Sequence, residues 1–352
     1  MYILLAILIF GVLIFVHELG HFLAAKSLGV KVNEFAICMG PAIVQKTVGE
    51  TTYSLRCIPI GGYCAMEGED AASDNPRAFT SAKWWKRLII LVAGSFMNFL
   101  AGFLIITLVL STAEGFYTTR IDSVFPGSVI EEGGLRAGDT FYSIGGQRVY
   151  LASDVELLLD RLREPETEIT VLRDGEKKTF SDFFVEKREY EVEGKKELKY
   201  GLRLGTEDAT FGRLLHNSWY SCVDFCRMVW MGLSDLITGR AGLKDMGGPV
   251  TIVHTMNEQG KSAENAAEGV LNVLYMAAFI AVNLAVMNML PIPALDGGRV
   301  FLLLVSTLIT AVTGKKLNSK YEAYIHAAGM VLLLAFMAFI TFHDVWMLIF
   351  KK

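Results

Sequence analysis

Two histidines four residues apart enclose a glutamate in the run His17-Glu18-Leu-Gly-His21. On an α-helix this spacing puts both imidazoles on one face, about one turn apart. Imidazole nitrogens are common zinc ligands, and a glutamate between them can take a proton from a metal-bound water. The pattern predicts that His17 and His21 bind one Zn²⁺ per chain and that Glu18 is the catalytic base.

The sequence around this triplet strengthens the metal-site interpretation. Residues 2–25 are apolar over a length that crosses a bilayer of about 30 Å. A signal peptide fits poorly, because no basic residue precedes the run and the run continues through both histidines. Three ionisable groups within one turn of a membrane helix are costly unless they are paired or bound to a metal. The location therefore favours a metal site over chance packing.

A third protein ligand is needed, because catalytic zinc sites usually combine three protein ligands with water. Asp296 is the candidate, since it follows another apolar run through Asn288, Pro291 and Pro293. The two prolines must interrupt a helix, and irregular backbone at membrane depth is tolerated where it lines a cavity. Alternatively, Asp296 only caps a helix that begins at about Gly298.

Composition indicates a membrane protein with a soluble insertion. Of the 352 residues, 52% are hydrophobic and 20% are charged, and many of the charges lie between about 115 and 205. The apolar runs predict four transmembrane helices at about 2–25, 88–110, 269–290 and 323–350. A net charge of −4 provides no basic field for nucleic acid, and the five cysteines have neither zinc-ribbon nor disulfide spacing.

Lysine and arginine gather in two loops, between the first and second predicted spans and between the third and fourth, where Lys315 and Lys316 lie. The positive-inside rule makes both loops cytoplasmic, so the termini and residues 111–268 lie outside. The terminal Lys351 and Lys352 oppose this orientation. It predicts that the metal site lies near the cytoplasmic face.

The soluble segment has the pattern of an α+β domain. Short β-like runs at 119–124, 167–172, 179–185 and 198–204 enclose a helical stretch at 153–162. Residues 211–238 then place apolar side chains at helical spacing with charges between them. This pattern predicts an amphipathic helix or helix pair at the outer membrane surface, and not a fifth span.

HELGH in the first span and NMLPIPALDGG after the third together resemble the site-2 protease family of intramembrane zinc metalloproteases. Further motifs extend the resemblance across most of the chain. Residues 35–41 and 59–67 resemble the family's membrane-associated β-hairpin, residues 93–98 its second-span motif, and residues 247–252 the segment before its third span. Ser95 replaces the proline usual in the second-span motif. Residues 127–149 resemble one PDZ domain of the bacterial permuted type.

The resemblance implies the same metal site and adds a substrate-holding region. The implied zinc ligands are His17, His21 and Asp296, with Glu18 as the acid and base. The substrate-binding candidates are Asn288, Pro291, Pro293, Gly61 and Gly62. The proline-broken backbone and the Gly61-Gly62 hairpin are expected to pair with an unwound stretch of substrate helix, because a protease must act on extended peptide.

The expected fold is a multi-pass α-helical membrane protein with four transmembrane helices, a membrane-associated β-hairpin region and one inserted PDZ-like α+β domain. Residues 1–110 form a first catalytic membrane half with the HELGH helix, the hairpin and the second span. Residues 111–205 form the extracytoplasmic PDZ-like domain, and residues 206–268 an amphipathic helical linker. Residues 269–352 form the second catalytic half, with the Leu-Asp-Gly loop and spans three and four.

The expected activity is cleavage of transmembrane segments of single-pass proteins, such as anti-sigma factors or signal-peptide remnants, in a bacterial cytoplasmic membrane. The expected partners are substrates already cut by another protease, together with membrane lipid. Alternatives are an inactive membrane-anchored PDZ scaffold, a CAAX-type membrane protease and a transporter, although inverted repeats are not evident. His326, in the fourth predicted span, either hydrogen-bonds a group that holds the metal ligands or is a satisfied polar residue.

Overall fold

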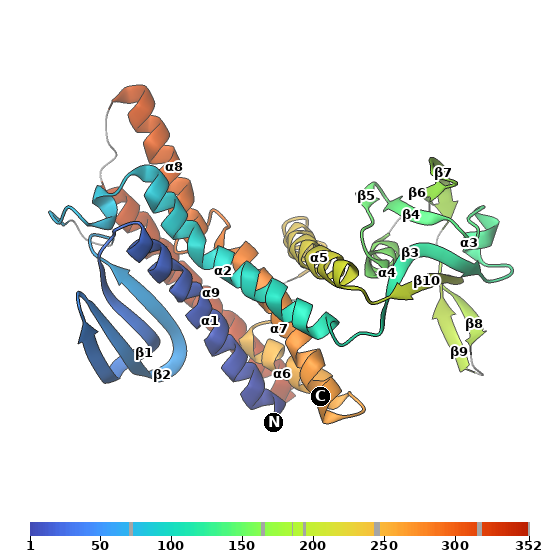
Figure 1. The fold of residues 1–352 in the computed structure, drawn as a ribbon, viewed down its shortest axis with the longest axis horizontal. Helices are drawn as coiled ribbons and strands as arrows, with labels where there is room; N and C mark the ends of the chain where they lie inside the picture. Colours follow the sequence, from blue (N-terminus) through green and yellow to red (C-terminus); the bar gives the residue numbers. More distant parts are fainter. Residues whose placement is uncertain are drawn as a thin grey trace. The chain divides into compact units, whose positions relative to one another are not determined.

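The computed structural model describes residues 1–69, 73–162, 166–184, 186–192, 195–242, 247–314 and 319–350 (Figure 1). The chain forms two compact units. One unit combines Met1–Val109 with Phe225–Lys352, and the other is Leu110–Asp224. The loop residues Lys315 and Lys316, the terminal Lys351 and Lys352, and Val185 at the end of a predicted strand lie outside the described residues.

Within the described part of the chain, five helices are long and apolar enough to cross a membrane. They are α1 (Tyr2–Ser27), α2 (Trp84–Leu110), α7 (Ala266–Asn288), α8 (Asp296–Thr313) and the Tyr324–Met347 part of α9 (Ser319–Phe350). Four of them match the predicted spans, and α8 is the addition. Its first turn contains Asp296 and Arg299, and the apolar run after these charged residues is too short to indicate a membrane helix in the sequence. How many helices cross the bilayer stays a prediction.

Glycines bring three of these helices into close contact. A Cβ atom on Gly20 of α1 would lie 2.8 Å from the backbone carbon of Ala93 in α2. A Cβ atom on Gly102 of α2 would lie 2.7 Å from a methyl of Val282 in α7. Small residues allow this approach where apolar surroundings provide no hydrophobic driving force. The helix α2 continues through Ser95, so the departure from the family's proline leaves a regular helix.

The predicted hairpin after the first span forms an antiparallel sheet of β1 (Val32–Val48) and β2 (Thr51–Met66). Phe35 of β1 pairs with both Tyr53 and Cys64, so the first part of β1 lies between two parts of β2. The ring of Phe35 lies 5.9 Å from that of Phe15 and 5.0 Å from that of Phe22, both in α1. These contacts fix the sheet against the first helix.

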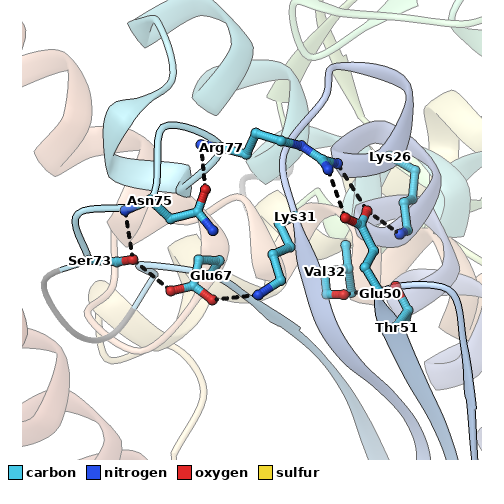
Figure 2. Close-up of polar contacts among 9 residues, drawn as sticks. All are labelled: Lys26, Lys31, Val32, Glu50, Thr51, Glu67, Ser73, Asn75 and Arg77. Carbon is cyan, nitrogen blue, oxygen red and sulfur yellow. Dashed lines mark hydrogen bonds and ion pairs between the residues drawn. The ribbon is translucent and has the colours of Figure 1, made fainter.

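Ion pairs hold the turn of this sheet, as Figure 2 shows. Glu50, between β1 and β2, accepts hydrogen bonds from Lys26 at 2.8 Å and from Arg77 at 2.7 and 2.9 Å. The hydrogen bonds from Arg77, and then that from Lys26, lower the pKa of Glu50 to about 2. Lys31 pairs with Glu67 beyond the end of β2. The turn is thereby tied to the last turn of α1 and to the segment before α2.

The second unit contains a sheet with the strand order β10-β3-β4-β6-β7, in which β5 also pairs with β4. Its strands are β3 (Gly115–Val124), β4 (Thr140–Ile144), β5 (Gln147–Arg148), β6 (Glu166–Arg173), β7 (Glu176–Phe184) and β10 (Leu202–Asp208). Two helices, α3 (Val129–Glu132) and α4 (Ala152–Arg161), and a hairpin of β8 (Arg188–Val192) and β9 (Lys195–Lys199) accompany it. This mixture of strands and helices agrees with the predicted α+β class. The PDZ assignment stays a prediction.

One predicted strand, residues 198–204, is wrong as a single element. The structure divides it between β9 and β10 at Gly201, whose φ of +79° lies in the left-handed region that favours glycine. A Cβ atom there would lie 2.6 Å from the hydroxyl of Tyr190. The left-handed backbone at Gly201 interrupts the strand, and only glycine fits there beside Tyr190. The alternation of side chains did not indicate this break.

A buried ion pair fastens β6 to the start of β4. Asp139 is 1% exposed and accepts hydrogen bonds from Arg173 at 2.7 Å on each of its two carboxylate oxygens. The backbone N–H of Arg136 adds a third at 2.9 Å. Burial disfavours the charged carboxylate, but these hydrogen bonds keep the pKa of Asp139 below its ordinary value.

The segment that was predicted as an amphipathic helix or helix pair is one continuous helix, α5 (Phe211–Ile237). Its Phe225 packs on α7, with ring centroids 5.6 Å from Tyr275 and 5.4 Å from Phe279. A further helix, α6 (Pro249–Lys261), precedes α7. The backbone N–H groups of Gly248 and Thr251 at its start donate to Asp344 of α9, at 3.2 and 3.1 Å. That carboxylate satisfies backbone donors that a helix start leaves unpaired.

Candidate metal centre

The structure brings Asp296 to the two histidines of α1. Nε2 of His17 lies 3.1 Å from Oδ2 of Asp296, and Nε2 of His21 lies 3.2 Å from the same oxygen. The two Nε2 atoms are 3.2 Å apart. The three atoms form a nearly equilateral triangle at the start of α8, buried against α1.

The triangle fits a tetrahedral zinc ion. Bonds of about 2.0–2.1 Å place the ligand atoms of a tetrahedral site about 3.3–3.4 Å apart. Oδ2 of Asp296 is buried, and among the described residues it accepts no hydrogen bond of ordinary geometry. A cation between the three atoms would satisfy this oxygen and both nitrogens at once, so the residues suit the metal.

Buried partners orient both imidazoles. Nδ1 of His21 lies 2.8 Å from the carbonyl oxygen of Ile90, so its N–H donates there and leaves the Nε2 lone pair for a metal. Nδ1 of His17 lies 3.4 Å from the amide nitrogen of Asn98, whose own amide oxygen is buried without a donor. Half a turn of that amide lets its oxygen accept from His17, which satisfies the oxygen and frees Nε2 of His17 for the metal.

Helix α2 also provides the space that the imidazoles occupy. A Cβ atom on Gly94 would lie 2.7 Å from Cε1 of His17 and 2.8 Å from Cε1 of His21. Gly94 and Asn98 both belong to the second-span motif noted in the sequence. Their contact with the histidines could not be derived there, because nothing in the motif states which helix it faces.

Glu18 lies between the metal-facing side chains and the β1–β2 sheet. A Cβ atom on Gly62 of β2 would lie 3.6 Å from Cγ of Glu18. Glu18 also interacts electrostatically with His17, His21 and Asp296. Gly61 contacts Met39 of the sheet instead, and its φ of +82° turns the backbone there. Of the two predicted hairpin glycines, Gly62 is the one against the glutamate.

The other predicted substrate-binding residues lie around the loop that enters α8. Asn288 ends α7 and is half-buried, Pro291 is exposed, and Pro293 is half-buried. The loop folds tightly over the start of α8, since a Cβ atom on Gly298 would lie 2.8 Å from the backbone carbon of Ile292. This packing leaves Asp296 as the first residue of the helix.

An ion pair that the sequence does not indicate joins the sheet to α8. Arg299, one turn after Asp296, pairs with Glu69 just beyond β2. Glu69 also accepts a hydrogen bond from the backbone N–H of Met66 at 3.3 Å. No local pattern could indicate this pair, because its members are distant in the chain.

Comparison with known proteins places these features in a family. A sequence model of peptidase family M50 matches residues 5–336. A Clostridium perfringens protein named as a zinc metalloprotease is 35% identical over 98% of both chains. The regulator of sigma-W protease RasP of Bacillus subtilis is 27% identical over 96% of this chain and 97% of its own. The chain therefore belongs to peptidase family M50, the site-2 proteases, and is a membrane-embedded zinc metalloprotease.

Proposed function

We propose that the chain is an intramembrane endopeptidase that cleaves the transmembrane segments of single-pass membrane proteins. In this proposal His17, His21 and Asp296 hold one zinc ion and Glu18 is the catalytic base. The observation that supports it most directly is the convergence of the three ligand atoms, at 3.1–3.2 Å from one another, within helices apolar enough to cross a membrane. Membrane helices seldom contain such groups without a functional reason.

Bound zinc supplies Lewis acidity, which lowers the pKa of water and polarises a peptide carbonyl. The Glu18 carboxylate accepts a proton from the attacking water as the new C–O bond forms. It then returns that proton to the leaving amide nitrogen as the C–N bond breaks, and is regenerated. Ile90 and Asn98 hold the two imidazoles in place during these transfers.

The outer part of β2 is the proposed site for the extended substrate. Residues 62–65 pair with β1, and among the described residues they have no second strand beside them. An unwound peptide can add there by backbone hydrogen bonds. Because Gly62 lies against Glu18, such a peptide would pass the catalytic base. Asn288, Pro291 and Pro293 would hold it from the loop before α8.

The relatives support a role in regulated proteolysis. RasP carries the name regulator of sigma-W protease, and a protease linked to a sigma factor favours membrane substrates such as anti-sigma factors. We propose that the substrates, which also include signal-peptide remnants, are first cut by another protease. The enzyme would lie in the bacterial cytoplasmic membrane with the active site near the cytoplasmic face. The PDZ-like domain at 111–205 would lie outside as a size filter or docking site.

The test uses the full chain in liposomes with a single-pass reporter. Glu18→Gln is expected to abolish cleavage and retain zinc, whereas the exposed loop variant Glu264→Gln is expected to behave as wild type. Cleavage that persists in Glu18→Gln would exclude the mechanism. Loss of cleavage in both variants would show that the assay is not specific to the site.

Metal content tests the ligand set separately. Asp296→Ala is expected to lower the zinc content well below one ion per chain, because two imidazoles alone leave the ion short of a ligand. Unchanged zinc content would exclude Asp296 as a ligand. A wild-type chain that binds zinc but cleaves no reporter would instead favour the inactive-scaffold alternative.

A further inference from the structure

We infer that His326 of α9 is a positioning residue for Asp296. It holds the loop between α7 and α8 in the shape that directs the Asp296 carboxylate at the two histidines. The inference rests on the proposed role of Asp296 as a zinc ligand, and it adds α9, which provides no ligand, to the parts of the chain that determine metal binding.

The first observation is a backbone conformation that needs support. Ala294 has a φ of +82°, in the left-handed region that residues with a Cβ atom rarely adopt. Its backbone N–H donates a hydrogen bond to Nδ1 of His326 at 3.3 Å. Without this acceptor the N–H would lose the hydrogen bond it makes here, and the strained conformation would lose the contact that stabilises it.

The second observation is a close contact one turn farther along α9. A Cβ atom on Gly329 would lie 2.8 Å from the backbone carbon and oxygen of Pro293. His326 and Gly329 are three residues apart and therefore lie on the same helix face. Helix α9 thus contacts two consecutive residues of the loop, one by a hydrogen bond and one by backbone packing.

The third observation is that the backbone between this contact and the metal-facing carboxylate is short and fixed by hydrogen bonds. Leu295 donates its N–H to the carbonyl of Ile292 at 3.2 Å and accepts from Gly298 at 3.1 Å. Asp296, the next residue, begins α8. A change in the backbone of Ala294 therefore rotates the peptide that enters α8 and moves the carboxylate away from the imidazoles.

The rest of α9 provides a matched control. Most of its described side chains are exposed, including Val331 at 70% and Leu332 at 73%. A second polar contact of α9 is made by Asp344 with the start of α6, 18 positions farther along the helix. Asp344 anchors α9 without contacting the loop, so it separates an effect on α9 as a whole from an effect on the loop.

The experiment measures metal binding by the full chain in detergent, with graded chelator competition for Zn²⁺ and the visible spectrum of the Co²⁺-loaded protein. His326→Leu removes the acceptor and is expected to weaken zinc binding about tenfold or more. His326→Asn places an amide oxygen near the position of Nδ1 and is expected to restore most of the affinity. Asp344→Ala is expected to bind zinc as wild type does.

Wild-type zinc affinity and an unchanged Co²⁺ spectrum in His326→Leu would overturn the inference. Equal weakening in His326→Leu and Asp344→Ala would overturn it too, because docking of α9 in general would then be the cause. If His326→Leu does not fold, Gly329→Ala tests the same contact through Pro293, and wild-type affinity there refutes it. Because the readout is metal binding, a failure of proteolysis leaves the result interpretable, and unchanged affinity in Asp296→Ala identifies a failure of the ligand set instead.

Discussion

Replacing Gly94 with alanine should damage the metal centre without damaging the helix that carries it. The added Cβ atom would lie 2.7 Å from Cε1 of His17 and 2.8 Å from Cε1 of His21. Carbon atoms in contact are ordinarily about 3.5–4.0 Å apart, so the rings must move by about 1 Å. A shift of α1 as a whole cannot relieve this collision, because Gly20 of α1 already packs against the backbone of α2.

A misplacement of about 1 Å in a catalytic group costs about 100-fold in rate, which is about 2.7 kcal/mol of transition-state stabilisation. We expect kcat/KM of Gly94→Ala to fall by about this factor, and its zinc affinity to fall by about 10- to 100-fold. Alanine is a better helix former than glycine by about 1 kcal/mol, so a loss of activity or zinc would not result from weaker helix formation in α2.

The assay combines metal analysis with cleavage of a single-pass reporter, and the control is Gly11→Ala in α1. A Cβ atom at Gly11 meets nothing within 4 Å, so this variant makes the same chemical change in a membrane helix without a collision. Wild-type zinc content and activity in Gly94→Ala would refute the placement of the imidazoles against α2. Equal losses in both variants would mean that the membrane helices tolerate no added methyl group, and that the collision is not the cause.

Three further predictions concern the rest of the chain. Asp139→Asn breaks the buried pair with Arg173 and should destabilise the second unit by about 3 kcal/mol. In wild type the pair stabilises the folded unit fully above the unfolded-state pKa of Asp139, about 4, and this stabilisation is lost as the pH falls through its lowered folded-state pKa. Hydrogen exchange in β3–β7 should therefore accelerate in acid in wild type and not in the variant. Gly62→Val should lower kcat/KM about tenfold with zinc content unchanged, since its Cβ atom would lie 3.0 Å from the Ala36 carbonyl oxygen and its methyl groups would crowd Glu18. Wild-type kcat/KM would exclude that contact. Deleting residues 115–205 should broaden substrate use and retain zinc, and loss of zinc would mean that the domain is structural.

The sequence alone determined the parts of this protein that depend on local geometry. His17, Glu18 and His21 lie within about one helical turn, so the helical repeat is enough to place them together once the segment is helical. The long apolar runs likewise predicted α1, α2, α7 and α9, because length and apolar character identify a membrane helix. The same argument overlooked α8, whose first turn is polar, and it merged β9 with β10 across Gly201.

Only the tertiary structure decided which distant residues surround the triplet. Asp296 was a candidate ligand by chemistry, but its distance from the histidines depends on how α8 packs against α1. Gly94 makes room for the imidazoles and His326 supports the loop before Asp296, and neither role follows from the local pattern. The physical reason is that periodicity states which face of an element is apolar, whereas the partner of that face is chosen by the packing of the whole chain.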